Sequence, residues 1–164
     1  MTTETASTRT EGLLALFDLQ TGFLSRALDG MSEQDMHNRL GTKANHMAWL
    51  AGALVAQRYM MVSETHPEMK QTGAELFANF KGIDDAATYP GVAEYLQDWD
   101  KVSPFAREAL AALDDRKLDS RFDMGDMEMT WHDLISFTIY REASMIGQLA
   151  LWRRLLNNPA MKYD

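Results

Sequence analysis

Apolar residues recur at every third or fourth position in four long stretches of the chain, which is the spacing of amphipathic helices. The stretches span residues 11–28, 42–63, 92–113 and 130–156. This pattern predicts an all-α protein with four main helices. On one side of the second stretch it places His46, Leu50, Ala53, Leu54 and Gln57.

Residues at the ends of these stretches have the chemistry of helix caps. Gly30 follows the first stretch, and glycine readily adopts the left-handed geometry found after a helix end. The hydroxyl of Thr130 can accept from the free amides of the last helix, with Asp133 completing an approximate capping box. Pro104 lies inside the third stretch, where we expect it to bend the helix rather than end it.

The connections on either side of the third stretch are long. Residues 68–90 are polar, and we expect a short helical turn at 74–80 whose Leu76, Phe77 and Phe80 form an apolar plug. A connection of this length often packs as a lid or serves a function. Residues 114–129 are acidic and contain methionines, and within them residues 121–126 are expected to pair as a hairpin.

Composition narrows the class of protein. A length of 164 residues suits one domain, residues 1–164, with a polar and flexible tail at 1–10. The absence of cysteine excludes disulfides, thiolate metal sites and a cysteine nucleophile. A net charge of −8 argues against nucleic-acid binding, which depends on lysine and arginine. Without an apolar leader or a long apolar span, we expect a cytoplasmic protein that does not bind membranes.

Two short segments carry a family resemblance. Residues 44–52 read Ala-Asn-His-Met-Ala-Trp-Leu-Ala-Gly, and Gly147-Gln148 is followed by Leu149 and Arg153-Arg154. Both segments resemble the DinB-like superfamily, which usually has a His-x-x-x-His pair just before a Gly-Gln in its last helix. The resemblance implies a four-helix bundle of DinB-like type with a long connection between the second and third main helices.

The resemblance also implies a metal site that this chain has largely lost. Two histidines four positions apart share one helix face and can bind one metal ion. Arg141 and Met145 occupy those two positions here, while His46 matches the first metal-binding histidine of the family. One imidazole cannot hold Zn²⁺ or Ni²⁺ in a three-ligand site. We therefore expect no cofactor, the alternative being Zn or Ni bound by His46 with other ligands.

The fourth stretch contains an arginine in the row that we expect to face inward. Arg141 either reaches the rim with its charge in water, or lies in the old metal cavity as a fixed charge that pairs with a carboxylate or an anionic ligand. Met145 fits core filling, and Glu142 is expected to point about 100° away from Arg141. The full expected row is Leu134, Thr138, Arg141, Met145, Gln148, Trp152 and Leu155.

Three further residues of this stretch favour structural roles. Gly147 permits the close approach of a neighbouring helix, and Arg153 and Arg154 are expected on a solvated face near the helix end.

Two functions from different classes follow from these features. The first is non-catalytic: a metal-free bundle that binds a small, anionic molecule near the vestigial metal cavity, or a dimeric interaction protein. Its candidate ligand-binding residues are His46, Arg141, Met145 and Gln148. The alternative is a divergent metal-dependent hydrolase or thiol-dependent transferase that uses His46, and we assign no catalytic residue to it.

A homodimer is the expected assembly. The outer rows of the first and fourth helices carry apolar residues, and family analogy favours a symmetric pair of chains. The candidate contact residues are Phe17, Tyr140 and Trp152.

Overall fold

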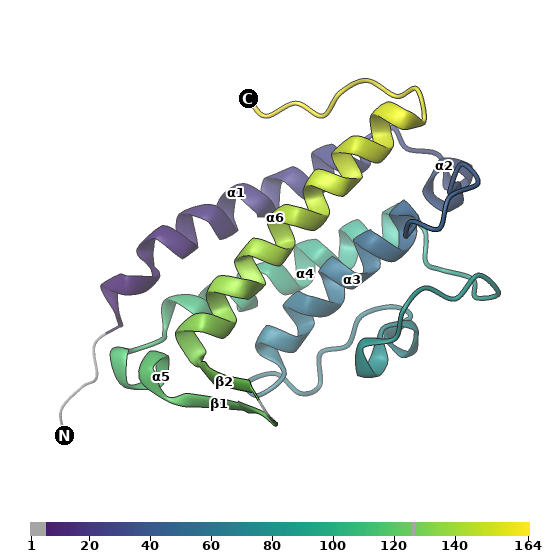
Figure 1. Cartoon of the computed structure of the whole chain (residues 1–164). Helices are drawn as coiled ribbons and strands as arrows, with labels where there is room; N and C mark the ends of the chain where they lie inside the picture. The colour runs from purple at the N-terminus through teal and green to yellow at the C-terminus, as the bar shows by residue number, and fades with distance from the viewer. Residues whose placement is uncertain (1–5, 126) are drawn as a thin grey trace.

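Helices make up most of the protein (Figure 1). The computed structural model describes residues 6–125 and 127–164. Its four long helices lie side by side, with α1 against α6 and α4, and with α3 against α4 and α6. Their inner faces enclose one apolar core. The four helices are α1 (Glu11–Leu28), α3 (Met47–Val62), α4 (Val92–Ala111) and α6 (Trp131–Leu155).

The predicted ends of α1 and α6 are confirmed. Helix α1 ends before Gly30, which has a φ of 70°. At the start of α6, the Thr130 hydroxyl accepts from the amide of Asp133 at 3.1 Å, and the Asp133 carboxylate accepts from the amide of Thr130 at 3.0 Å. Reciprocal hydrogen bonds of this kind fix the first turn of a helix. Helix α4 continues through Pro104, as expected.

Helix α3 begins five residues later than its periodicity predicts. The side chain of Arg39 donates to the carbonyls of Lys43 and Ala44, which holds these residues outside a helix. His46 then caps α3, because its Nδ1 accepts from the amide of Trp49 at 3.0 Å. The short helix α2 (Glu33–His37) precedes this segment and is too short to produce a periodic pattern.

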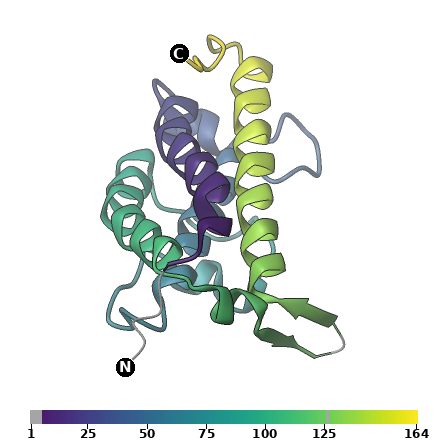
Figure 2. The same ribbon diagram turned by 90° about the vertical axis from the view of Figure 1, so that its left-hand side faces the viewer.

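The connections contain the short elements that we expected and one that we did not. The turn at 74–80 is present as η2 (Ala74–Leu76) and η3 (Ala78–Phe80). Helix α5 (Asp115–Asp119) was not predicted. The hairpin is present and longer than predicted, with β1 (Arg121–Met124) antiparallel to β2 (Met127–Thr130) at the start of α6 (Figure 2). Asp126, at the end of the predicted hairpin, lies outside the described residues.

The N-terminal segment is ordered where the structure describes it. Residues 1–5 lie outside the described residues, whereas Thr8–Thr10, expected in a flexible tail, form the short helix η1. The amide of Ser7 donates to the carbonyl of Leu113 at 2.8 Å. Ser7 and Thr10 are buried, so this segment packs against the helices.

The inward face of α6 differs from the predicted row. Arg141 is only half-buried, and Gln148 and Leu155 are exposed, whereas Glu142 is fully buried. Met145 and Trp152 of the predicted row are buried, as expected. Adjacent helical residues differ by about 100° in direction, so the assignment of Arg141, Gln148 and Leu155 to the inward face was wrong by roughly one residue. The buried residues are Ile135, Ile139, Glu142, Met145, Ile146, Leu149, Trp152 and Arg153.

Two expectations near the end of α6 are also wrong. Arg153 is buried rather than solvated, and its guanidinium donates to the carbonyls of Ala27 and Pro159 at 3.1 Å each. It therefore ties the end of α1 and the C-terminal segment to α6. Gly147 is exposed, and a Cβ built on it meets nothing within 4 Å, so no neighbouring helix approaches there.

None of the described helices combines the length and the apolar character that a membrane span requires.

Candidate functional site

Arg141 lies on the flank of α6 that faces α3. Its Nη1 donates to Oε1 of Gln57 at 2.6 Å, and Nε2 of Gln57 donates to the carbonyl of Thr138 at 3.0 Å. Gln57 is buried. Both the oxygen and the nitrogen of its side-chain amide are bonded to residues of α6. The Gln57 side chain therefore fixes where the guanidinium of Arg141 lies between the two helices.

The charge of Arg141 is not neutralised by a neighbouring carboxylate. Burial lowers the pKa of Arg141, and the nearby charge of Glu142 opposes that effect. The Glu142 carboxylate itself is bonded to Arg58. Within the described part of the chain, no carboxylate lies within ion-pair distance of Arg141. Arginine nevertheless keeps its proton in proteins, so a half-buried positive charge remains.

A cavity of about 80 Å³ opens beside this guanidinium. It lies between α3, α6 and the connection that carries η2 and η3, and its lining contains two cationic side chains and no acidic one. Small residues on α3 leave the space. The lining residues are Trp49, Ala53, Ala56, Gln57, Met60, Phe77, Phe80, Lys81 and Arg141.

The indole of Trp49 lines this cavity and carries an unpaired donor. Its Nε1 is buried and has no hydrogen-bond partner among the described residues. Buried donors in folded proteins are nearly always paired, because an unpaired one costs about 1–3 kcal/mol. Nε1 has almost no solvent-accessible surface, so Trp49 lines the cavity without presenting this N–H to it.

The positive charge of Lys81 is partly neutralised, unlike that of Arg141. Its ammonium lies 3.1 Å from the carboxylate of Asp84, and both side chains are partly exposed. The ion pair leaves Arg141 as the main unneutralised cation of the cavity.

The predicted plug is confirmed for Leu76 and Phe77, which pack against the core, and wrong for Phe80. The ring of Phe77 lies directly on Gly52 of α3, with ring centroids 6.5 Å from Trp49 and 6.0 Å from Tyr89. A Cβ on Gly52 would come within 2.1 Å of the Phe77 ring and 2.7 Å of the Tyr95 hydroxyl. Only glycine allows this close approach, which holds the connection against α3.

Phe80 stands at the mouth of the cavity instead of plugging it. Its side chain is 79% exposed, and Phe80 and Asn79 have φ values of 57° and 55°. Two successive non-glycine residues in the left-handed region are uncommon and cost conformational energy. This strain at the mouth marks the connection as a candidate functional segment.

His46 does not line this cavity. It caps α3 about 16 Å along the helix axis from Gln57. Its ring packs against His37 and Tyr89, with centroids 5.2 and 5.0 Å away. Burial, followed by the charge of His37, lowers the pKa of His46 to about 4. The imidazole is therefore neutral at physiological pH.

The donor geometry of His46 does not fit a metal ligand. Its Nδ1 accepts from the amide of Trp49, so the proton of the neutral ring is on Nε2, and neither nitrogen offers a free lone pair. Arg141 has no lone pair to offer, and Met145 carries a soft thioether. Among the described residues, no three His, Asp or Glu side chains gather as a metal site would require.

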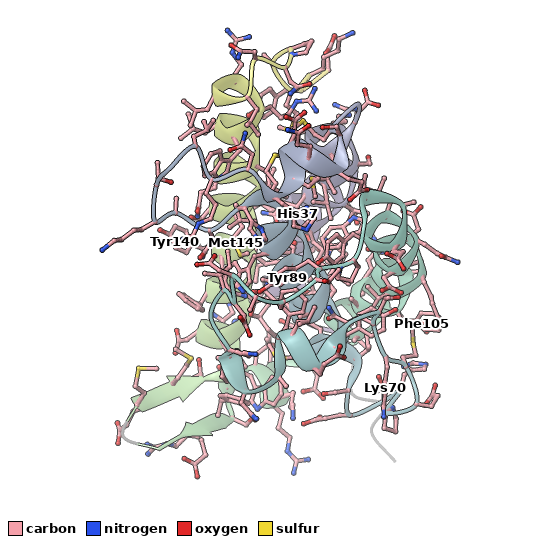
Figure 3. All side chains as sticks on the ribbon, turned by 90° about the vertical axis from the view of Figure 1, so that its right-hand side faces the viewer. His37, Lys70, Tyr89, Phe105, Tyr140 and Met145 are labelled. Carbon is pink, nitrogen blue, oxygen red and sulfur yellow. The ribbon has the colours of Figure 1, made fainter. Side chains whose placement is uncertain are left out.

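The other predicted ligand residues do not line the cavity. Met145 is buried one turn beyond Arg141, and Gln148 is exposed. In Figure 3, both Met145 and Tyr140 lie on the α6 side of the connection that crosses in front of α3, although Met145 is buried and Tyr140 is exposed. Of the four predicted residues, the structure therefore places only Arg141 in the cavity wall.

Sequence reasoning did not assign Trp49, Gln57 and Lys81 to the site. The sequence could have indicated Gln57, because it is a polar residue on the apolar side of the second stretch. Lys81 lies in an irregular connection, where periodicity gives no information.

Comparison of the chain with known family models and with curated proteins finds no match in either case.

Proposed function

We propose that this protein is a metal-free helical bundle of DinB-like type that binds a small carboxylate in the cavity beside Arg141. The observation that supports this function most directly is the half-buried guanidinium of Arg141, whose hydrogen-bond partner is the uncharged amide of Gln57. A guanidinium binds a carboxylate through two parallel hydrogen bonds, which gives both affinity and orientation.

The bound carboxylate accepts from Arg141, and Lys81 adds positive charge to the lining. The described lining contains no hydroxyl, carboxylate or imidazole, and its one amine, that of Lys81, is ion-paired with Asp84. This composition supports a binding protein over an enzyme. The alternative, a metal-dependent hydrolase or thiol-dependent transferase that uses His46, is weakened by the occupied Nδ1 of that residue.

The test is a titration with butyrate, followed by NMR of the tryptophan indole N–H signals. Butyramide has the same size without the charge and serves as the matched control ligand. We expect butyrate, and not butyramide, to shift the signal of Trp49. The Arg141→Met variant should bind butyrate at least ten-fold more weakly, because a charge-assisted bidentate pair is lost. Equal binding by Arg141→Met and the wild type would refute the proposal.

Arg154→Met is the matched control variant for that titration. Arg154 is an exposed arginine on the same helix, near its C-terminal end. Its replacement removes the same charge from the protein as a whole. The affinity for butyrate should not change.

We further propose a homodimer, with a different contact face from the one expected. Phe17 is 1% exposed and Trp152 is 5% exposed, so these two candidates belong to the core of one chain. Tyr140 is 67% exposed and belongs to an apolar stripe along the outer face of α6, opposite its buried face. The stripe consists of Phe137, Tyr140, Leu151 and Leu155.

Residues at these positions share one side of a helix, as a symmetric helix-to-helix contact requires. Sedimentation of the wild type should give twice the chain mass, and Leu151→Glu should give a monomer. Leu19→Glu introduces the same charge at an exposed leucine of α1 and should leave the dimer intact. A monomeric wild type would exclude this assembly.

A further inference from the structure

A second and larger hollow adjoins the proposed carboxylate site. Its volume is about 400 Å³, and it lies between the C-terminal half of α3 and residues 69–80 of the connection. The two hollows share four lining residues: Ala56, Met60, Phe77 and Phe80. They therefore adjoin each other under the connection, and the two together are called the groove. Figure 3 shows this connection in front of α3, with Lys70 on the side away from α6.

The shared wall of the groove is apolar and unusually exposed. Met60 is 52% exposed and Phe80 is 79% exposed. Large apolar side chains beside a hollow gain free energy when a ligand removes them from water. The thioether of Met69 also faces the larger hollow, and flexible methionines adapt to ligands of varied shape.

Two polar side chains of the larger hollow, Tyr59 and Gln71, are already engaged with the protein. The hydroxyl of Tyr59 lies 3.4 Å from the Asp98 carboxylate, and Nε2 of Gln71 lies 3.4 Å from the carbonyl of Gly52. Lys70 stands in the wall with an exposed side chain. The larger hollow thus suits an apolar group, whereas the smaller one suits an anion.

From this division we infer the class of ligand: an unbranched, medium-chain fatty acid. The inference rests on the proposed carboxylate site. The carboxylate binds Arg141 beside the ring of Trp49 in the smaller hollow. The hydrocarbon chain crosses Met60 and Phe80 and ends in the larger hollow. The protein as a whole is acidic, but the described walls of both hollows contain no acidic residue. The smaller hollow contains Lys81 and Arg141 and the larger one contains Lys70, so neither wall repels a carboxylate.

Chain length provides the decisive measurement. Burial of each methylene group strengthens binding about four-fold, so affinity should rise along the series butyrate, hexanoate, octanoate and decanoate. Isothermal titration of the full chain measures each constant, with butyramide and decanol as uncharged controls. We expect decanoate to bind at least 100-fold more tightly than butyrate, and decanol at least ten-fold more weakly than decanoate.

A variant that fills only the larger hollow tests where the hydrocarbon lies. Ala74 is exposed in η2 and lines the larger hollow but not the smaller one. Ala74→Trp should bring the affinity for decanoate close to that for butyrate and leave butyrate binding unchanged. Ala93→Trp, at an exposed alanine of α4, is the control and should change neither constant. Phe80→Ser removes the shared wall from an exposed position, and we expect at least a five-fold loss for decanoate.

The outcomes separate this inference from the function on which it rests. Affinity that does not rise with chain length, while butyrate still binds in an Arg141-dependent way, overturns the fatty-acid ligand and leaves the carboxylate site standing. Decanoate binding that is insensitive to both Ala74→Trp and Phe80→Ser also overturns it. If no member of the series binds in an Arg141-dependent way, both proposals fail.

Discussion

Arg58 of α3 and Glu142 of α6 form a two-pronged ion pair at the centre of the core. Nε lies 2.9 Å from Oε1 and Nη2 lies 2.9 Å from Oε2, and both side chains are 0% exposed. The guanidinium lies between two aromatic rings, 3.7 Å from the centroid of Phe17 and 3.6 Å from that of Trp99. The pair joins α3 to α6 and stacks on residues from α1 and α4.

The remaining donors of Arg58 are also satisfied. Its Nη1 donates to the hydroxyls of Thr21 and Ser103 at 2.7 and 2.8 Å. Burial lowers the pKa of Arg58, and the hydrogen bonds and charge of Glu142 oppose that effect. A buried charge with every donor paired is tolerated, whereas removal of one partner leaves the other charge in a medium of low polarity.

Glu142→Gln should therefore be strongly destabilising. We expect the free energy of unfolding to fall by about 3–5 kcal/mol, since Arg58 keeps its charge in the core without a counter-charge. Urea denaturation followed by circular dichroism gives the measurement. The exposed pair Arg107–Asp18 provides the control, and Asp18→Asn should leave the midpoint nearly unchanged. A loss below about 1 kcal/mol in Glu142→Gln would mean that the pair contributes little.

Arg141→Met should cost far less stability than Glu142→Gln. Arg141 is half-buried and bonded to the neutral amide of Gln57, so its removal leaves one buried oxygen unpaired and no orphan charge. We expect a loss of about 1 kcal/mol, measured in the same denaturation experiment. A loss of several kcal/mol would show that Arg141 is a structural residue of the core, and its ligand-binding role would need another basis.

Arg141 and Glu142 show how precisely the buried face of a helix could be predicted from the sequence. The fourth stretch correctly predicted a charged residue among the apolar rows of α6, but it selected Arg141 instead of its neighbour Glu142. Periodicity defines a helix face only to within about one residue, or 100°. The choice between neighbours depends on the partner across the core, and Arg58 lies 84 positions away along the chain.

The elements themselves were easier to predict than the site. The bounds of α1 and the capping of α6 follow from local residues, because Gly30 and Thr130 act within one turn of the chain. The start of α3 could not be predicted in this way, since it depends on the side chain of Arg39 and on the cap formed by His46. The cavity needs the connection to fold back over α3, and that arrangement depends on Phe77 meeting Gly52.

Gly52→Ala should displace the connection from α3. The added methyl group would come within 2.1 Å of the Phe77 ring, and the nearby hydroxyl of Tyr95 limits any shift. We expect a loss of about 1–3 kcal/mol from overpacking and a faster exchange of amide hydrogens in residues 74–80.

The double variant Gly52→Ala/Phe77→Ala tests the cause of that loss. If the methyl group acts through the Phe77 ring, the cost of Gly52→Ala should nearly vanish in the Phe77→Ala background. Additive costs would mean that Gly52 matters for another reason. Gly22→Ala is the control, because a Cβ at that exposed position of α1 meets nothing within 4 Å.

His46 should make stability depend on pH below neutrality. Its pKa is lowered to about 4 in the folded protein, from an ordinary value of 6.5. The folded state therefore disfavours the protonated ring. The stabilisation from the neutral ring is complete above pH 6.5 and is lost as pH falls through the folded pKa near 4. Urea denaturation at pH 7.5, 5.5 and 4.5 follows the loss.

His46→Asn removes the titrating group and keeps a side chain that can cap α3. Between pH 7.5 and 4.5 the wild type should lose on the order of 2 kcal/mol more than this variant. His132→Asn, in the first turn of α6, controls for a general effect of removing a histidine. Parallel pH profiles for the wild type and His46→Asn would contradict the buried neutral imidazole.

The same imidazole decides between a binding protein and a metal-dependent enzyme. Because Nδ1 of His46 accepts from the amide of Trp49, a bound Zn²⁺ or Ni²⁺ would have to displace either that hydrogen bond or the Nε2 proton.

We expect protein prepared without an affinity tag or chelator to hold less than one tenth of an equivalent of either metal, measured by plasma mass spectrometry. A metal that binds the folded state raises the melting temperature. We therefore expect no rise when Zn²⁺ is added. One equivalent of metal that is lost in His46→Asn and kept in His37→Asn would instead support the hydrolase or transferase alternative. Binding through Nδ1 would also require α3 to begin differently, because that nitrogen could no longer cap the helix.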